Sequence, residues 1–269
     1  MPDAGTVAAL RRYPVKSMLG EDLGRALLTA SGLEGDRVAA VIDRQTGEVA
    51  TAKHPRRWRG LLAFAAEWNG GSPRITPPDG APIAADDSAA ERLLSEVLQR
   101  DVRLSTIRPE RAVVGRPAPE DVIEAGEDAD VPYELLEIGQ GTPGTTFVDY
   151  APVHLITSAT LAHVGAEMIR YRPNLVLDIP GAPAFAENDW TGRAVAIGPV
   201  VLRVVLPTPR CAVPTLAHGA LPRRTDAVRR LLEQNRIPIP EFGVRPCLGA
   251  YAQVVNGGTI SLGDRASLG

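Results

Sequence analysis

The chain has 269 residues, with 29 Lys and Arg against 32 Asp and Glu, so its formal charge is −3. This balance leaves no basic surplus to hold a phosphate backbone or an anionic lipid surface, which excludes a dedicated nucleic-acid or membrane-surface protein. Cys211 and Cys247 are the two cysteines, too few for a disulfide scaffold or an all-cysteine zinc or iron–sulfur site. We therefore expect any iron–sulfur cluster or haem to sit on another protein.

The first residues, MPDAGTVAALRRYPVKS, lack an apolar core of signal-peptide length, and no run approaches the ~20 apolar residues needed to span a bilayer. We expect a cytoplasmic protein with no membrane span. The 26 glycines and 24 prolines favour many short strands and turns over a helix bundle.

The first half of the sequence predicts short strands arranged as an antiparallel meander. The expected strands are Thr6–Arg12, Arg25–Ala30, Arg37–Asp43, Glu48–Lys53 and Val102–Thr106, with a further apolar stretch at Leu61–Trp68. Ser88 and Glu91 form a capping-box pattern ahead of leucines at helical spacing, which predicts the first helix.

Residues 109–130 hold three prolines, two glycines and a cluster of acidic groups, which indicates an exposed connection between two halves. We place one domain at 1–108 and a second at 131–269. In the second half we expect strands at Tyr133–Ile138, Val153–Ile156, Asn174–Ile179, Arg193–Ile197 and Val200–Leu206, helices at Ser158–Arg170 and Thr225–Asn235, and a closing hairpin of Leu248–Val255 with Thr259–Leu262.

The sequence argues against the common motifs for nucleotide, zinc, serine and dithiol chemistry. Residues 139–144 spell GxGxxG, but Pro143 and the β-branched residues that follow deny the helix that a dinucleotide site requires. The four histidines show neither HxH nor HExxH spacing, which disfavours a zinc hydrolase. The sequence also has no GxSxG elbow, P-loop or CxxC pair.

One cysteine lies in a proline-braced loop. Pro207, Pro209 and Pro214 surround Cys211 after a strand of alternating character, and they fix backbone torsions on both sides of it. The adjacent Arg210 favours the thiolate, which is the form that binds metals and attacks electrophiles. The alternative is a small buried hydrophobe beside a surface arginine.

A second feature is a set of anion-binding side chains near the N-terminus. Lys16 and Ser17 follow Tyr13-Pro14-Val15, and Arg37 ends the run Gly32–Arg37. Each lies at a turn or a strand end, and a hairpin between them would bring the three together. Lys, Arg and a hydroxyl form a phosphate-binding set, although each alone can be a solvated surface side chain. Arg172 and Asn174 likewise stand just before an apolar strand, where the arginine could instead interact with a helix dipole.

These motifs together, in this order, resemble the MOSC family (molybdenum-cofactor sulfurase C-terminal domain) with its N-terminal β-barrel domain. The motifs are YPVKS at 13–17, GLEGDR at 32–37, RPN at 172–174 and PRC at 209–211. Within the family, the likeness is to the mitochondrial amidoxime-reducing component and its bacterial relatives. It implies a mixed α/β, mainly β fold, in which an N-terminal β-barrel-like region precedes a MOSC β-barrel with a few helices.

The resemblance also implies a molybdenum pterin cofactor (molybdenum-molybdopterin). Cys211 would supply thiolate sulfur to the metal beside the two dithiolene sulfurs, and soft sulfur ligands suit a redox metal. Lys16, Ser17 and Arg37 would hold the pterin phosphate. The pterin itself would be held by Arg172, Asn174, Arg210 and the chain near Tyr150 and Ala151.

The activity implied is reduction of small N-hydroxylated compounds, such as hydroxylamines or amidoximes, by removal of the N–OH oxygen. Relatives with a fused ferredoxin domain carry extra cysteines after the MOSC domain, whereas this sequence ends at Gly269. We therefore expect a separate electron-transfer partner, either ferredoxin-like or cytochrome b5-like with its reductase.

Two alternatives stay open at this point. The chain could be a carrier that binds the cofactor or a persulfide at Cys211 without turnover, or an interaction module with no cofactor. Cys247 precedes an apolar strand and is expected to be a structural core cysteine. His218 could supply a proton near the metal, but an exposed loop histidine is the favoured interpretation.

Overall fold

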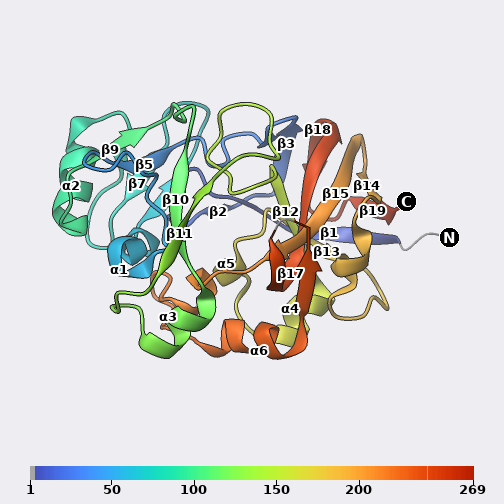
Figure 1. Ribbon diagram of the computed structural model, residues 1–269. Helices are drawn as coiled ribbons and strands as arrows, with labels where there is room; N and C mark the ends of the chain where they lie inside the picture. The colour runs from blue at the N-terminus through green and yellow to red at the C-terminus, as the bar shows by residue number, and fades with distance from the viewer. Residues whose placement is uncertain (1–3, 241) are drawn as a thin grey trace.

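The computed structural model describes residues 4–240 and 242–269, and in them the chain is mixed α/β and mainly β (Figure 1). This confirms the predicted fold class. In Figure 1 most of the N-terminal half lies on the left, around α2 and β9, and the C-terminal strands lie on the right. Strands β1 (Ala4–Arg12) and β3 (Arg25–Thr29) are exceptions, because they lie with the C-terminal strands.

Most of the C-terminal half forms a closed β-barrel. Around the ring the strands are β12 (Val153–Thr157), β13 (Leu175–Asp178), β1 (Ala4–Arg12), β19 (Arg265–Leu268), β14 (Ala194–Ile197), β15 (Val200–Pro209) and β17 (Gly243–Asn256). β17 pairs back with β12, which closes the ring of seven strands. Two short strands extend it: β2 (Glu21–Asp22) pairs with β1, and β16 (Arg236–Ile239) pairs with β17.

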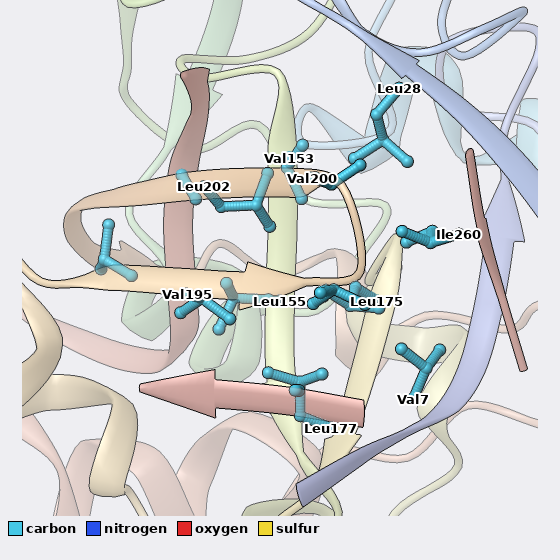
Figure 2. Close-up of a cluster of buried hydrophobic side chains, with 14 of the residues drawn as sticks. Val7, Leu28, Val153, Leu155, Leu175, Leu177, Val195, Val200, Leu202 and Ile260 are labelled. Atoms are coloured by element: carbon cyan, nitrogen blue, oxygen red, sulfur yellow. The ribbon is translucent and has the colours of Figure 1, made fainter. Parts of the chain in front are cut away.

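Alternating residues of the barrel strands fill its interior. In β15, Val200, Leu202 and Val204 are buried and Arg203 is exposed, as expected for a strand with one face in the core. Figure 2 shows side chains from several strands meeting in this core, among them Val7, Val153, Leu155, Leu175, Leu177 and Val195. Burial of each Val or Leu side chain contributes about 1.5–3 kcal/mol to the free energy of folding. The barrel is therefore a firm frame for the loops at its ends.

A second core lies in the N-terminal half. Its elements are β5 (Ala40–Asp43), α1 (Pro55–Trp58), β6 (Ala65–Glu67), β7 (Arg74–Thr76), β8 (Ile83–Ala84), α2 (Ser88–Leu98) and β9 (Val102–Ser105). Trp58, Phe64 and Leu94 are among its buried side chains. The helix predicted around Leu93 and Leu94 is thus confirmed as α2. Its N-cap is Asp87, whose side chain accepts from Ala89 N, so the predicted Ser88 capping box is wrong.

The two halves share hydrogen-bonded strands. β1 pairs with β13 and β19, and β3 (Arg25–Thr29) pairs with β18 (Gly258–Ser261) as well as with β4 (Gly32–Leu33). The predicted N-terminal meander and the closing hairpin are therefore wrong, because these strands find partners far away in sequence. The domain boundaries placed at 108 and 131 stay a prediction.

The segment expected to be an exposed connection has regular structure. β10 (Val113–Pro117) and β11 (Tyr133–Glu137) form an antiparallel ribbon, and α3 (Pro119–Ala125) lies between them in sequence. Val114 and Ala112 are buried and pack in one cluster with Phe147. The acidic and proline-rich composition belongs to α3 and its flanks, while the strand buries the apolar residues.

Three further expectations need correction. Glu48–Lys53 is not a strand and makes only the single bridge Ile42↔Val49. The stretch Leu61–Trp68 divides into the end of a 3₁₀ helix and β6. The helix expected at 158–170 breaks at Gly165, whose φ of +61° ends α4 (Ser158–Val164) before α5 (Met168–Tyr171) begins. The other predicted helix is confirmed as α6 (Asp226–Gln234). Over residues 4–240 and 242–269, no helix has the length and apolarity that a membrane span requires.

Candidate functional site

Eight of the nine predicted site residues line one cavity of about 650 Å³, open mouth included, which we call the cationic cavity. They are Lys16, Ser17, Arg37, Ala151, Arg172, Asn174, Arg210 and Cys211. The ninth, Tyr150, lines the neighbouring cavity described below. Lys16 and Asn174, which are far apart in the sequence, meet at one site because β1 lies next to β13 in the barrel.

The N-terminal anion-binding residues come together through a parallel bridge, and the expected hairpin between them is wrong. Val15 bridges Ala39 in parallel, Lys16 N donates to Ala39 O at 2.9 Å, and Arg37 N donates to Tyr13 O at 2.8 Å. The backbone is unusual at these points. Ser17, Arg37 and Arg172 have φ of 66°, 46° and 57°, which is the left-handed region that non-glycine residues seldom adopt. Such torsions cost free energy and are characteristic of binding sites.

A buried tyrosine ring holds two arginines beside each other. The guanidinium carbons of Arg172 and Arg37 lie 4.3 and 4.7 Å from the centre of the Tyr13 ring. Attraction to the ring offsets part of the repulsion between the two cations. Burial, together with the neighbouring Arg37, lowers the pKa of Arg172 to about 10. Both groups are charged at neutral pH, so an anion bound here would relieve their repulsion.

Asn174 orients Arg37 through its side-chain amide, which makes three hydrogen bonds and keeps one N–H donor. Its Oδ1 accepts from Arg37 NH1 at 3.0 Å and from His154 N at 3.2 Å, and its Nδ2 donates to Arg11 O at 3.2 Å. The Asp36 carboxylate also pairs with Arg37 NH1. These contacts leave the guanidinium with few accessible rotamers, so Asn174 is a positioning residue for Arg37.

Lys16 and Lys53 share one carboxylate. Lys16 Nζ lies 2.6 Å and Lys53 Nζ 2.8 Å from Asp149 Oδ1, and Lys16 also donates to Phe147 O at 2.9 Å. Burial raises the pKa of Asp149, but the two ammonium groups outweigh it and hold the pKa well below its usual range. Burial lowers the pKa of Lys16 to about 8. Asp149 is therefore an anchor for two cations and is not a proton donor at neutral pH.

The loop after β15 presents Cys211. The strand runs on to Pro209 with register shifts, further than the predicted end at Leu206, and Arg210 N donates to Pro246 O at 2.7 Å. Arg210 NH2 donates to Tyr171 O at 2.8 Å, while its buried Nε has no partner among the described residues. Cys211 is a free cysteine that lines the cavity and is only 7% exposed.

A neighbouring cavity of about 740 Å³, again including its mouth, shares part of its lining with the first, including Cys211. We call it the apolar cavity. The two cavities share the side chains of Lys53, Asp149, Arg210, Cys211 and Tyr251. The thiol is therefore open to two spaces of different character.

Sequence reasoning missed several residues of the site, among them Lys53, Asp149, His154 and Tyr251. Lys53 lies two residues before Pro55, where α1 begins. The proximity of a cation to a proline at a helix start is the only feature of the sequence that could have indicated a role for Lys53. His154 is buried, and burial together with Arg210 lowers its pKa well below 6.5, so it is neutral. Gly249 makes room for its ring: a Cβ there would lie 2.7 Å from His154 Nε2, at φ +73°.

The structure shows the surroundings of Cys247 and His218, whose roles the sequence left open. Cys247 is fully buried, and burial raises the pKa of its thiol to about 12, in line with the expected structural role. His218 is buried, so the favoured exposed loop position is wrong. Burial lowers the pKa of His218 to about 4, and its ring does not line either cavity. A neutral histidine outside the cavities is not a proton source for the site at neutral pH.

Comparison with known families and proteins identifies what the chain is similar to. The family model for the MOSC domain matches residues 143–267, and the model for the MOSC N-terminal beta barrel domain matches residues 4–108. The chain is 25% identical over 303 residues to mitochondrial amidoxime-reducing component 1 of Homo sapiens, covering 98% of this chain and 83% of that protein. It is also 25% identical over 287 residues to mitochondrial amidoxime reducing component 2 of Homo sapiens, with the same coverage.

The two models together cover most of the chain and leave residues 109–142 between them. The resemblance inferred from the four motifs is confirmed. The chain belongs to the MOSC family, with a MOSC N-terminal β-barrel domain ahead of its MOSC domain.

Proposed function

We propose that the chain binds a molybdenum pterin cofactor in the cationic cavity and reduces small N-hydroxylated compounds. One observation carries the proposal: a single cavity joins the arginine and lysine cluster at one part of its wall to the thiol of Cys211 at another. The relatives named amidoxime-reducing components support the reaction class, since they align with 98% of the chain.

The cluster has donors to spare for a phosphate. An ammonium carries three donors, and Lys16 uses two of them on Phe147 O and Asp149. Ser17 Oγ accepts from Ala52 N at 3.0 Å, so its hydroxyl hydrogen is free to point into the cavity. Arg37 adds the planar fork that suits phosphate oxygens. Lys16, Ser17 and Arg37 would hold the phosphate of the cofactor.

The rest of the cavity suits a polar heterocycle. The buried Nε of Arg210 has no partner among the described residues, and an unpaired buried donor is costly unless a ligand satisfies it. Arg172, Asn174 and Ala151 line the same space. These residues would grip the pterin, with Tyr150 contributing through its backbone. Its side chain lines the apolar cavity.

Cys211 would bind the metal through its thiolate, because soft sulfur ligands suit a redox metal. When bound, the cofactor supplies a two-electron redox centre beside this sulfur. The overall reaction balances as R–NHOH + 2 e⁻ + 2 H⁺ → R–NH₂ + H₂O, so each turnover consumes an external reductant. We propose a separate electron-transfer protein, ferredoxin-like or cytochrome b5-like, as its source. The expected cytoplasmic location stays a prediction.

The test uses protein from a host able to make the pterin. We expect bound molybdenum in the wild type and loss of most of it in Cys211→Ala, together with benzamidoxime reduction by an artificial electron donor in the wild type alone. Absence of molybdenum, or molybdenum unaffected by C211A, would overturn the proposal. Molybdenum bound through Cys211 without turnover would instead support the carrier function.

A further inference from the structure

The apolar cavity has a wall that comes from the segment between the two family-model matches. Residues 109–142 lie in neither match, yet they supply Val114, Arg116, Leu136, Glu137, Ile138 and Gln140 to the lining. Figure 1 shows the β10–β11 ribbon standing between the N-terminal elements and the barrel strands. Connecting segments held on a rigid scaffold often carry the residues that contact a ligand, so this wall is a candidate for setting specificity.

The ribbon turns one defined face to this cavity. Val114 and Leu136 stand directly opposite each other in the β10–β11 register, so their side chains share a face. Val114 is fully buried and Leu136 half-buried, whereas Leu135 is 55% exposed on the other face. The register of the ribbon therefore places this aliphatic surface in the cavity. Leu135, the adjacent residue in the strand, lies on the opposite face and can serve as a control position for substitutions of Leu136.

The remaining apolar wall is aromatic. The rings of Tyr150 and Phe242 are 5.8 Å apart at 82°, and those of Tyr150 and Tyr251 are 6.0 Å apart. Leu206 packs in the same cluster. Three aromatic rings and an aliphatic surface around one space form a lining that favours a flat apolar ring, since aromatic pairs gain from edge and offset contacts.

Several polar groups of the apolar cavity lie on the side that it shares with the cationic cavity, and Arg116 NH2 donates to Arg210 O there at 3.4 Å, whereas Glu137 and Gln140 are exposed. Lys53, Asp149, Arg210 and Cys211 line both cavities, while Val114, Leu136 and Phe242 line only the apolar one of the two. A ligand with a polar head and an apolar body would therefore orient with its head toward Cys211.

We infer that the apolar cavity is the substrate chamber and selects N-hydroxylated compounds with an aromatic body, with the β10–β11 ribbon as the specificity wall. This inference rests on the proposed function for the N–OH group. Recognition of the aromatic body depends only on the cavity itself.

Binding of two probes to the purified full-length chain, measured by calorimetry, tests the inference. Benzamidoxime has an aromatic body and acetamidoxime only a methyl group. We expect benzamidoxime to bind at least about tenfold more tightly, because even one methylene in an apolar site is worth this much. Leu136→Trp fills the cavity and should raise the benzamidoxime Kd at least about tenfold. The matched variant Leu135→Trp, on the exposed face, should leave it unchanged.

If Leu136→Trp does not fold, Leu136→Ala replaces it and should weaken benzamidoxime binding about threefold or more through lost apolar contact. Equal affinity for the two probes, or an L136W or L136A protein that binds benzamidoxime like the wild type, would overturn the inference. If the enzyme turns over aromatic and aliphatic N-hydroxylated compounds equally well, the inference about the apolar cavity is wrong but the proposed function is supported. If the two probes bind as expected but no N-hydroxylated compound is turned over, the proposed function is wrong and the inference that the cavity recognises an aromatic body is supported.

Discussion

The cationic and apolar cavities share five lining residues, Cys211 among them, but are built by different means. The cationic cavity depends on left-handed backbone at Ser17, Arg37 and Arg172 and on charges paired in fixed positions. The apolar cavity depends on side-chain packing along the β10–β11 ribbon and on three aromatic rings.

This difference separates two tasks. The anion-binding residues Lys16, Ser17, Arg37 and Arg172 lie inside the regions that the family models match, whereas the ribbon lies between those regions. Under the proposed function, cofactor binding and substrate choice can change independently, since the two cavities share only Lys53, Asp149, Arg210, Cys211 and Tyr251. A substitution in one cavity should therefore change ligand binding in that cavity and leave ligand binding in the other cavity unchanged.

Removing the shared sulfur should have the largest effect. Cys211→Ala should lower benzamidoxime turnover by at least about a thousandfold, the scale seen when an essential reacting group is deleted. Cys247→Ala is the matched control, because Cys247 is a buried free cysteine outside both cavities. It should cost about 1 kcal/mol in unfolding free energy and retain turnover. Steady-state kinetics and chemical unfolding measure the two effects, and turnover that survives C211A would contradict the comparison.

Arg172→Gln should act on the cationic cavity alone. A charge-assisted hydrogen bond is worth about 1.5–3 kcal/mol, so the Kd of the cofactor-free chain for sulfate should rise roughly tenfold to a hundredfold. Arg203→Gln removes an exposed arginine of β15 and should leave sulfate binding unchanged. Benzamidoxime binding should be the same in all three proteins. Equal sulfate affinity in R172Q and the wild type would show that the arginine pair is not the anion site.

The ring beneath the arginines should have a smaller effect. Tyr13→Leu removes the face on which Arg37 and Arg172 lie, and a cation–π contact is worth about 0.5–2 kcal/mol. Sulfate affinity should fall roughly threefold to tenfold, with circular dichroism confirming the fold. Tyr13→Phe keeps the ring and should bind sulfate like the wild type. A Y13L protein with normal affinity would mean that the ring merely fills space.

The smallest effect is a pH dependence. Since the pKa of Lys16 is lowered to about 8, its ammonium loses its proton as the pH rises through that value. The cationic cavity then loses one positive charge, and sulfate affinity should fall about threefold between pH 7 and pH 9. Sulfate keeps a constant charge over this range. Lys16→Arg stays protonated and should give a flat profile, whereas a flat profile in the wild type would exclude Lys16 from the anion site.

Local pattern predicted much of the site because its residues stand beside prolines and turn residues. Lys16 and Ser17 follow Pro14 and Val15, and Arg210 and Cys211 follow Pro209. These prolines indicate where strands end, so the sequence itself predicts that the four residues lie at strand ends. What local pattern misses is pairing at long range. Asp149 matters because two lysines from distant segments converge on it, and no motif near it signals this contact.

The same limit explains the errors in the fold. β10 was hidden in a segment whose prolines and acidic residues are typical of a linker, and its identity as a strand depends on the partner β11. β18 was expected beside β17 because they are adjacent in sequence, but it pairs with β3. Helix α2 was predicted well because its apolar spacing and its contacts are local.

X-ray absorption at the molybdenum edge of the loaded protein tests the central claim most directly, because it counts the sulfur atoms bound to the metal. The proposal predicts that one sulfur ligand is lost in Cys211→Ala relative to the wild type and that none is lost in Cys247→Ala. An unchanged sulfur count in C211A would contradict it, since Cys211 would then not be a ligand of the metal.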